Sequence, residues 1–269
     1  MIPFNLDAYL ARIGYTGART PTLETLRAIH ALHPAEIPFE NLNPLLRMPV
    51  KLDIESLQQK LIHSGRGRYC YQHNTLVKHA LEALGFKVTG LGARVLWSRP
   101  IEAITARTHM LLLLELERER FIADVGFGGQ TPTAPLRLEV DTIQETPHEP
   151  CRLIRYDDNF VLQAQIRNEW RALYKFDLQP HYPPDYEVTN WYLSNNPESH
   201  FVTGLRAARA VRGRRYGLLN NELSIHEAMG SQSRRLSSAQ EMQETLASTF
   251  GIRLPDHPEL TATLARLIP

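Results

Sequence analysis

The sequence contains few cysteines, with only Cys70 and Cys151 among 269 residues. Two cysteines do not make a disulfide framework, and no spacing of cysteine and histidine is typical of a zinc site, so we expect no metal. Charge of one sign is not in excess either, because 30 basic and 29 acidic residues leave a net charge of +1. This balance gives no reason to expect nucleic acid as a partner.

Long apolar runs are also missing. The run that follows His109 is too short to span a bilayer, and the N-terminus lacks a basic region followed by an apolar core. We therefore expect no membrane partner and a cytoplasmic location. The chain does have 43% hydrophobic and 22% charged residues, which is enough for a large core divided among two or three lobes.

The hydrophobic pattern changes along the chain. Residues 1–85 are rich in helical periodicity, with helices expected at 7–13, 22–32 (before Pro34) and 53–63. The following residues show short apolar runs instead, which predict a β-barrel or a strongly curved sheet. The expected strands span 88–96, 109–116, 121–125, 152–156, 160–166 and 170–176.

The remainder of the chain mixes helices and strands. Ser238 and Glu241 form a capping-box pattern, which predicts the start of a helix. We also expect a linker at 179–184 and an irregular helical piece at 186–193. Strands are expected at 201–211 and 214–222, and a final helix at 258–267.

Cys70 lies directly before a run that is typical of an amphipathic helix. Apolar residues recur there at helical spacing, and Gly85 supplies a left-handed stop. Cys70 would therefore lie in or just before the first turn, where unpaired N–H groups and the helix dipole favour a thiolate. This position favours a nucleophile. The alternative is a small buried apolar residue, the role of most free cysteines.

Two apolar stretches downstream offer a base and a group to orient it. The first begins at His109, the second ends at Asp124, and residues 117–119 alone separate them, which predicts an antiparallel hairpin. Antiparallel pairing would bring the imidazole and the carboxylate together on one face. Cys70, His109 and Asp124 would then form a triad. The alternative is an ordinary core histidine and a turn aspartate at a strand end.

Four motifs, in this order, make the chain resemble the arylamine N-acetyltransferase family. They are Pro-Phe-Glu-Asn-Leu at 38–42, Arg-Gly-x-x-Cys-Tyr-x-x-Asn at 66–74, Thr-His-Met at 108–110 and Asp-Val-Gly-Phe-Gly at 124–128. The resemblance implies an α+β fold with a cysteine-proteinase-like core. A helical domain (1–85) would carry the nucleophile, and a β-barrel domain (86–180) would carry His109 and Asp124. An interdomain segment with an α/β lid (181–269) would follow.

The same resemblance implies an acetyl-CoA-dependent N-acetyltransferase. The acetyl group would move from the co-substrate acetyl-CoA to Cys70, and then to an arylamine, arylhydrazine or hydrazide, in a ping-pong mechanism. His109 would be the base and Asp124 would orient it. The physiological acceptor, the preferred acyl chain and the oligomeric state stay open.

The family motifs also suggest substrate contacts. Coenzyme A would meet the glycine-rich turn formed by Gly126, Gly128, Gly129, Gln130 and Thr131. The aromatic acceptor would contact Phe39, Tyr71, Val95, Phe127 and Phe201. Without the resemblance, tight bends would explain the glycines, and packing in the core would explain the aromatic residues.

Several charged or polar positions near Cys70 are also informative. Glu40 and Arg66 are expected to form a structural ion pair that supports the Cys70 loop. Family members usually have glycine at the position of Arg68, and often glutamate at the position of Gln72. We therefore expect these two residues to alter the rate or selectivity of the enzyme. Five arginines between 206 and 215 are expected to form a solvated strand face, or else to meet a ligand phosphate.

Three other functions remain open at this point. An amide synthase of the same family, acting in polyketide biosynthesis, would use the same triad without free coenzyme A. A papain-like or transglutaminase-like cysteine hydrolase shares the Cys, His, Asp order and needs an open cleft. A non-catalytic ligand-binding relative is disfavoured because Cys70, His109 and Asp124 are all present.

Overall fold

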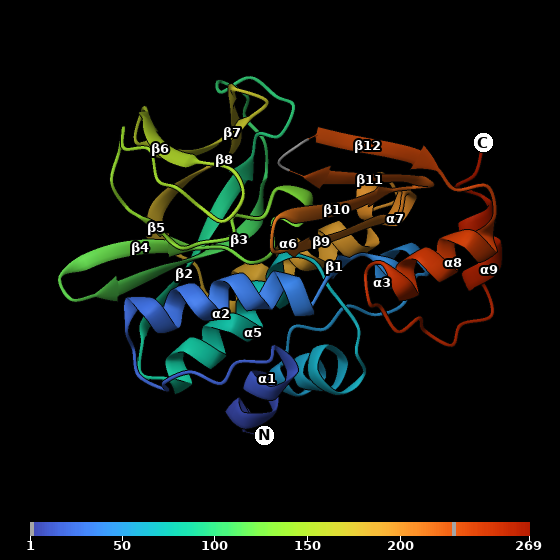
Figure 1. Ribbon diagram of the computed structural model, residues 1–269, viewed down its shortest axis with the longest axis horizontal. Coiled ribbons are helices and arrows are strands. Elements are labelled where there is room, and N and C mark those ends of the chain that lie inside the picture. The colour runs from blue at the N-terminus through green and yellow to red at the C-terminus, as the bar shows by residue number, and fades with distance from the viewer. Residues whose placement is uncertain (1–2, 228–229) are drawn as a thin grey trace.

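The computed structural model describes residues 3–227 and 230–269 and has an α+β fold, as the sequence predicts (Figure 1). Helices form the N-terminal part, a seven-stranded sheet follows, and a five-stranded sheet with two further helices forms the C-terminal part. The domain limits at residues 85 and 180 stay a prediction.

Three of the N-terminal helices begin at side-chain caps. Their bounds are α1 (Leu6–Arg12), α2 (Leu23–Glu36), α3 (Leu42–Leu45), α4 (Ile54–Leu57), the π-helix η1 (Gln58–His63) and α5 (Cys70–Ala83). Asn5, Thr22 and Asp53 each accept a backbone N–H at the start of α1, α2 and α4, respectively. The helix expected at 7–13 is confirmed within one residue at each end.

Two of the expected helices differ from the prediction. The helix predicted to end before Pro34 continues to Glu36. Pro34 is buried in the bundle beside His30 and His33, so packing outweighs the backbone hydrogen bond that proline cannot donate. The helix predicted at 53–63 changes from α to π geometry at Gln58. A π-turn has no hydrophobic period of its own that would reveal it in a sequence.

The seven-stranded sheet curves into a nearly closed barrel. Its strands are β2 (Lys87–Val95), β3 (Arg107–Leu116), β4 (Glu119–Ala123), β5 (Leu136–Arg137), β6 (Cys151–Tyr156), β7 (Asn159–Ile166) and β8 (Glu169–Pro180). They pair in the order β5-β4-β3-β2-β8-β7-β6, with antiparallel neighbours. Isolated bridges join Val140 to Leu153 and Gln144 to Cys151, so the chain after β5 returns to the edge strand β6.

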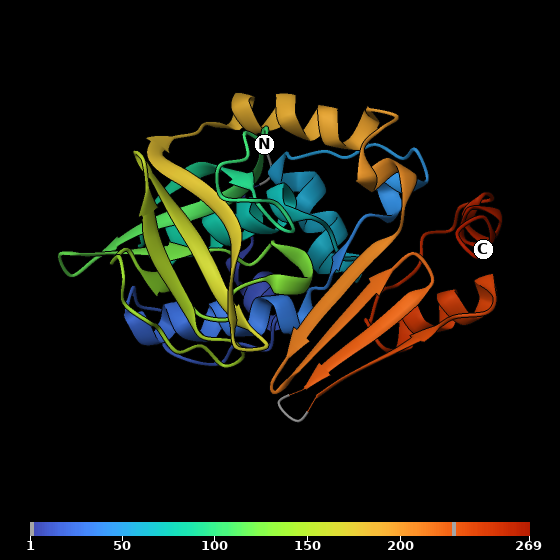
Figure 2. The same ribbon diagram turned by 90° about the horizontal axis from the view of Figure 1, so that it is seen from above.

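A long helix connects the barrel to the C-terminal sheet. Figure 2 shows α6 (Pro183–Asn195) running from the end of β8 toward α7 (His200–Thr203), on the side of the molecule opposite α2. The irregular piece predicted at 186–193 is therefore a regular helix, which Pro183 and Pro184 begin. Asp185 closes the first turn by accepting the N–H of Tyr182, at 2.8 Å.

The C-terminal sheet includes a strand from the N-terminal part. Its strands are β1 (Phe39–Glu40), β9 (Arg206–Val211), β10 (Arg214–Leu219), β11 (Glu222–Glu227) and β12 (Gly230–Arg235), paired in this order. The strand predicted at 201–211 begins only at Arg206, because Phe201 belongs to α7. Ser238 caps α8 (Ala239–Ser248) as predicted, and α9 (Leu260–Ala265) is shorter than expected.

Helix α5 occupies the centre of the molecule. Its apolar face, including Leu76, Val77, Ala80 and Leu81, is buried in a core shared with α2, β3 and α6. The first turn of α5, the start of β3 and the end of β4 thereby converge. The turn after β4 ends in the short 3-10 helix η2 (Gly128–Gln130) at the same place.

Candidate active site

Cys70 is the first residue of α5, as predicted. Its neighbour Tyr69 has an extended backbone (φ −107°, ψ −176°), which brings the chain into the 14-residue helix at the cysteine. The Cys70 side chain is buried, and its Sγ lies 3.8 Å from the carbonyl oxygen of Thr108. The thiol therefore lies at the positive end of a helix, where the first N–H groups have no helical acceptor.

His109 and Asp124 meet at the end of the predicted hairpin. Leu112 pairs with Ala123 across β3 and β4, so Asp124 lies one step beyond the ladder and diagonally across from His109. His109 Nε2 is 2.6 Å from Asp124 Oδ2, and both side chains are buried. Because Nε2 binds the carboxylate, Nδ1 is the ring nitrogen left to face Cys70.

The surroundings of this pair favour its charged form. Burial by itself would lower the pKa of His109, but the Asp124 carboxylate and a hydrogen bond with the Cys70 thiol raise it to about 10. Burial would raise the pKa of Asp124, but His109, Asn74 and the N–H of Gly126 hold it below its ordinary value.

Asn74 holds Asp124 in place, a role that the sequence did not predict. Its Nδ2 donates to Asp124 Oδ1 (3.0 Å) and to the carbonyl of Met110 (2.8 Å), while its Oδ1 accepts the N–H of Val125 (3.1 Å). Asn74 follows Cys70 by four residues and so lies one helical turn further on the same face. This spacing is the signal in the sequence that could have indicated it.

Gly126 packs directly on the nucleophile. A Cβ at this position would lie 2.8 Å from the Cα of Cys70 and 3.0 Å from Nδ2 of Asn74. The N–H of Gly126 donates to Asp124 Oδ1 at 2.9 Å. Glycine is therefore required here for a close approach between two backbones, and the predicted contact of Gly126 with coenzyme A stays a prediction.

The rest of the glycine-rich turn borders open space. Gly128 has a left-handed backbone (φ +79°), and the ring of Phe39 lies next to it. A Cβ at Gly129 would meet no atom within 4 Å, whereas Thr131 is buried. The turn can therefore receive a ligand at Gly129, while the coenzyme A contacts of Gly128, Gly129, Gln130 and Thr131 stay predictions.

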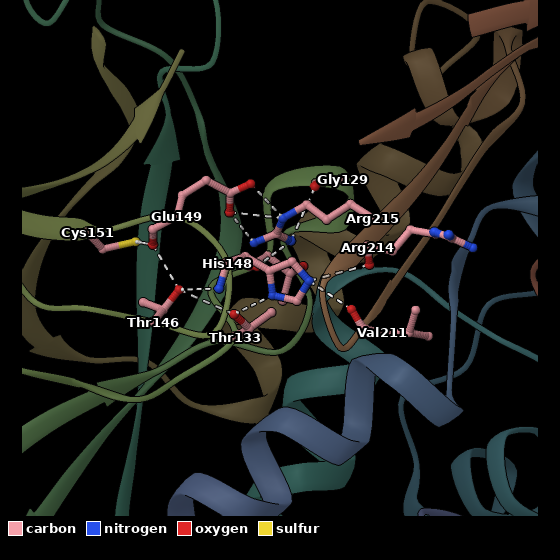
Figure 3. A network of polar contacts seen from close by, with 10 residues as sticks. Gly129, Thr133, Thr146, His148, Glu149, Cys151, Val211, Arg214 and Arg215 are labelled. Carbon is pink, nitrogen blue, oxygen red and sulfur yellow. Dashed lines mark hydrogen bonds and ion pairs between the residues drawn. The ribbon is translucent and has the colours of Figure 1, made fainter. Parts of the chain in front are cut away.

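Arg215 anchors this turn from the C-terminal sheet (Figure 3). Its Nη1 donates to the carbonyls of Thr131 (2.9 Å) and Gly129 (3.4 Å). Its Nε and Nη2 bind the Glu149 carboxylate, with a closest distance of 2.6 Å. Arg215 is only 3% exposed. Of the five clustered arginines, this one does not lie on a solvated face. Its guanidinium is also not available to a phosphate, because Glu149, in a loop of the barrel, already binds it.

His148 extends the same network between the two sheets (Figure 3). Its Nε2 donates to the carbonyl of Val211 at 2.9 Å, and its Nδ1 lies 3.0 Å from Oγ1 of Thr133. Burial and the nearby Arg215 lower the pKa of His148, which favours a neutral ring with its proton on Nε2 and a lone pair on Nδ1 for the threonine hydroxyl. His148 and Arg215 together connect the glycine-rich turn and the loop that follows it to β9 and β10.

Three of the predicted acceptor residues lie around the turn. The ring of Phe127 meets the ring of His109 edge-on, with 5.0 Å between centroids. The rings of Phe39 and Phe201 are 6.1 Å apart, and Phe39 also covers Gly128. These aromatic side chains form apolar walls beside the triad, and their contact with an acceptor stays a prediction.

The other two predicted acceptor residues are held in the core or a strand. Tyr71 is buried between Tyr69 and Tyr186, with ring distances of 6.3 and 5.7 Å. Val95 ends β2 and pairs with Tyr174, whose ring lies 5.0 Å from His109. Their acceptor contacts likewise stay predictions.

The structural ion pair between Glu40 and Arg66 is confirmed. Arg66 Nη2 and Nε lie 2.8 and 3.1 Å from Glu40 Oε1, and Glu40 Oε2 accepts the N–H of Leu42. Gln72 is fully buried and donates to the carbonyl of Lys51 at 2.6 Å. Arg68 is buried too, and within the described residues its Nε and Nη1 have no hydrogen-bond partner.

Residues 3–227 and 230–269 contain no group of three histidine, cysteine, aspartate or glutamate side chains that could hold a metal ion. In the same part of the chain, none of the helices combines the length and the apolar composition that crossing a membrane requires.

Comparisons with known proteins identify the class of this arrangement. Residues 22–259 match the family model described as N-acetyltransferase. The arylamine N-acetyltransferase of Mycolicibacterium smegmatis is 45% identical over 256 residues, covering 94% of this chain and 93% of that protein. The solved structure of Mycobacterium marinum arylamine N-acetyltransferase is 42% identical, with a TM-score of 0.96, covering 98% of this chain and 100% of that one.

The chain therefore belongs to the arylamine N-acetyltransferase family. A further structure of the M. marinum protein, in complex with CoA, matches with a TM-score of 0.95 at 42% identity, covering 98% of this chain and 100% of that one. These likenesses confirm the predicted family and the α+β fold class.

Proposed function

We propose that this protein transfers the acetyl group of acetyl-CoA to arylamines, arylhydrazines or hydrazides through an acetyl-Cys70 thioester. The contact of His109 with both Asp124 and the Cys70 thiol carries this proposal, because it supplies a nucleophile with a base and an orienting carboxylate. Family membership and the CoA complex of the M. marinum relative support acetyl-CoA as the donor.

The first half-reaction loads the enzyme. His109 takes the proton of Cys70, and the thiolate attacks the thioester carbonyl of acetyl-CoA. The new C–S bond gives a tetrahedral oxyanion, which collapses as the bond to the coenzyme A sulfur breaks. His109 returns the proton to that sulfur, and Asp124 holds the ring throughout. One thioester replaces another, so acetyl-Cys70 can persist.

The second half-reaction delivers the acetyl group. A neutral amine attacks the carbonyl of acetyl-Cys70, the C–N bond forms, and the bond to Cys70 Sγ breaks. His109 accepts the proton that the amine nitrogen loses and restores the charged pair. Coenzyme A leaves before the amine reacts, so the expected kinetics are ping-pong.

The backbone around Cys70 supplies oxyanion stabilisation in this proposal. The N–H groups of Cys70 and Tyr71 lie in the first turn of α5, where a helix leaves its N–H groups without acceptors. Preorganised donors of this kind stabilise a tetrahedral oxyanion. The dipole of the helix adds to the effect.

The two substrates would share the space around the glycine-rich turn. The open side of Gly129 would receive the pyrophosphate of coenzyme A, while the carbonyls of Gly129 and Thr131 are held by Arg215. Phe39, Phe127 and Phe201 would supply apolar walls for the aromatic acceptor.

The burial of the site supports acetyl transfer over hydrolysis of peptides. Cys70, His109 and Asp124 are 4%, 3% and 2% exposed, respectively. A peptide hydrolase needs an open cleft in which an extended chain can reach the nucleophile. A small acyl group on a narrow thioester arm fits this buried triad better.

Two free cysteines are also consistent with the proposed cytoplasmic location.

Intact-protein mass spectrometry tests the proposal. Wild type incubated with acetyl-CoA alone should gain the mass of one acetyl group, and adding an arylamine should remove it. Cys70→Ala should gain nothing, while Cys151→Ala, which removes the other buried thiol, should be acetylated like wild type. No mass gain in wild type, or equal gain in Cys70→Ala, would contradict the covalent mechanism. Loss of the acetyl group without an amine would point to a hydrolase.

A further inference from the structure

Three buried cations share one buried carboxylate next to the loop that leads into Cys70. Lys60, Arg66 and Arg68 are all buried, and all three lower the pKa of Glu40, which burial alone would raise. Arg66 makes the close ion pair, whereas Lys60 Nζ lies 3.9 Å from Glu40 Oε1. Glu40 raises the pKa of both Lys60 and Arg68, against the effect of burial.

The hydrogen bonds of these cations are incomplete. Lys60 Nζ donates to Asn43 Oδ1, and Arg66 donates from Nε and Nη2 to Glu40 and Asn43. In the described part of the chain, Nε and Nη1 of Arg68 are buried without a partner. Buried charges are costly unless they are paired and hydrogen-bonded. One carboxylate therefore serves three basic side chains, and burial lowers the pKa of Lys60 well below its ordinary value and that of Arg68 to about 9.

A cavity of about 340 Å³ opens at this cluster. Lys60 and Arg66 line it on one side, and Arg253 of the C-terminal segment lines it on the other. The Arg253 side chain lies against Gly65, whose left-handed backbone (φ +60°) and missing Cβ leave room for it. The N–H of Arg253 also donates to the carbonyl of Gly65 at 3.1 Å, which holds the two segments together. Arg253 itself is exposed.

We propose that this cavity binds a phosphate group between Lys60, Arg66 and Arg253. A phosphate near neutral pH carries close to two negative charges, so it would favour the charged form of Lys60 more strongly than a carboxylate, which carries one. Guanidinium groups and a lysine are the usual ligands of phosphate oxygens. The cavity shares no lining residue with the glycine-rich turn, so it is separate from the proposed seat of acetyl-CoA. Free phosphate and a phosphate monoester offer the same chemistry.

Calorimetric titration of the full-length protein with inorganic phosphate, at an ionic strength held constant with chloride, tests the site. Wild type should bind one phosphate, and phosphate should raise the midpoint of thermal unfolding in a saturable way. Arg253→Gln should weaken binding about tenfold, because it removes one charged hydrogen-bond donor. Arg27→Gln removes an exposed arginine of α2 outside the cavity and should bind like wild type.

A second titration, with glycerol 3-phosphate, which does not share the headgroup of coenzyme A, distinguishes free phosphate from a phosphate monoester. Tighter binding of this monoester that Arg253→Gln weakens would assign the site to a monoester, and weaker binding would assign it to the free ion; both support the site. Equal phosphate affinity in wild type and Arg253→Gln would overturn the proposal. So would a stabilisation that chloride reproduces at the same ionic strength. Arg253 is exposed, so loss of folding is not expected to obscure the result.

Discussion

Gly126 lies against Cys70 so closely that a Cβ on it would stand 2.8 Å from the Cα of the nucleophile. Contacts this short do not occur between side chains and backbone, so the two segments fit only with glycine at position 126. The turn after β4 and the first turn of α5 are thus packed backbone to backbone. This contact sets the position of the Cys70 thiol relative to His109.

Gly126→Ala should displace Cys70 and slow acetylation of the enzyme at least about tenfold, because small displacements of reacting groups cost large factors in rate. Gly217→Ala is the matched control, since a Cβ there meets nothing within 4 Å and Gly217 lies in β10, outside the glycine-rich turn. Single-turnover kinetics with acetyl-CoA measure the effect, and circular dichroism checks that both variants fold. Equal rates in the two variants would show that the close packing at Gly126 has no bearing on the nucleophile.

Asp124→Asn should abolish the charged pair that holds the imidazolium. The carboxylate keeps the pKa of His109 at about 10 in the wild type, so His109 stays protonated at neutral pH. We expect acetyl transfer to fall by about 10³-fold to 10⁴-fold in the variant, as in other triads. Single-turnover kinetics with acetyl-CoA measure the loss. The exposed Asp158→Asn is the control, and an unchanged rate in Asp124→Asn would refute the expectation.

Arg215→Gln should raise the KM for acetyl-CoA about tenfold and change the KM for the acceptor much less. The substitution releases the carbonyls of Gly129 and Thr131, and so loosens the turn proposed to receive coenzyme A. Arg214→Gln, on the same strand but exposed, should leave both constants near the wild-type values. Steady-state kinetics with each substrate varied in turn make the measurement. Equal changes in both KM values would indicate a general loss of structure.

The protein should lose stability as the pH falls from about 6.5 to about 4. Burial lowers the pKa of His30 and of His73 to about 4, and it also holds the pKa of His33 well below its ordinary value. The unfolded chain binds these protons near pH 6.5, so it takes up more protons than the native state in this range. The stability that these three histidines contribute is therefore complete above pH 6.5 and declines below it by about 1.4 kcal/mol per pH unit for each histidine.

His30→Gln tests this pH dependence. A glutamine carbonyl can still accept the N–H of Asp124, which His30 Nε2 accepts at 3.1 Å. The variant should take up about one proton fewer on unfolding at pH 5, measured as a smaller slope of unfolding free energy against pH. His63→Gln, on an exposed residue, should keep the wild-type slope. An unchanged slope in His30→Gln would mean that His30 is protonated in the native state.

Much of the site could be predicted because its signals are local. The helix beginning at Cys70 follows from hydrophobic period, and the hairpin between His109 and Asp124 follows from two apolar runs with a short connection. Predictions were wrong where packing overrode local preference, as at Pro34 inside α2. The π-helix at Gln58 was missed because it has no sequence period of its own.

The sequence by itself determined which side chains can carry chemistry, namely Cys70 at a helix start and His109 near Asp124 on one hairpin. Only the tertiary structure decided what supports them. Arg215 reaches Glu149 across 66 residues of sequence, and Asn74 reaches Asp124 across 50. Such contacts depend on how two sheets and a central helix pack together, and no local pattern of residues encodes that packing.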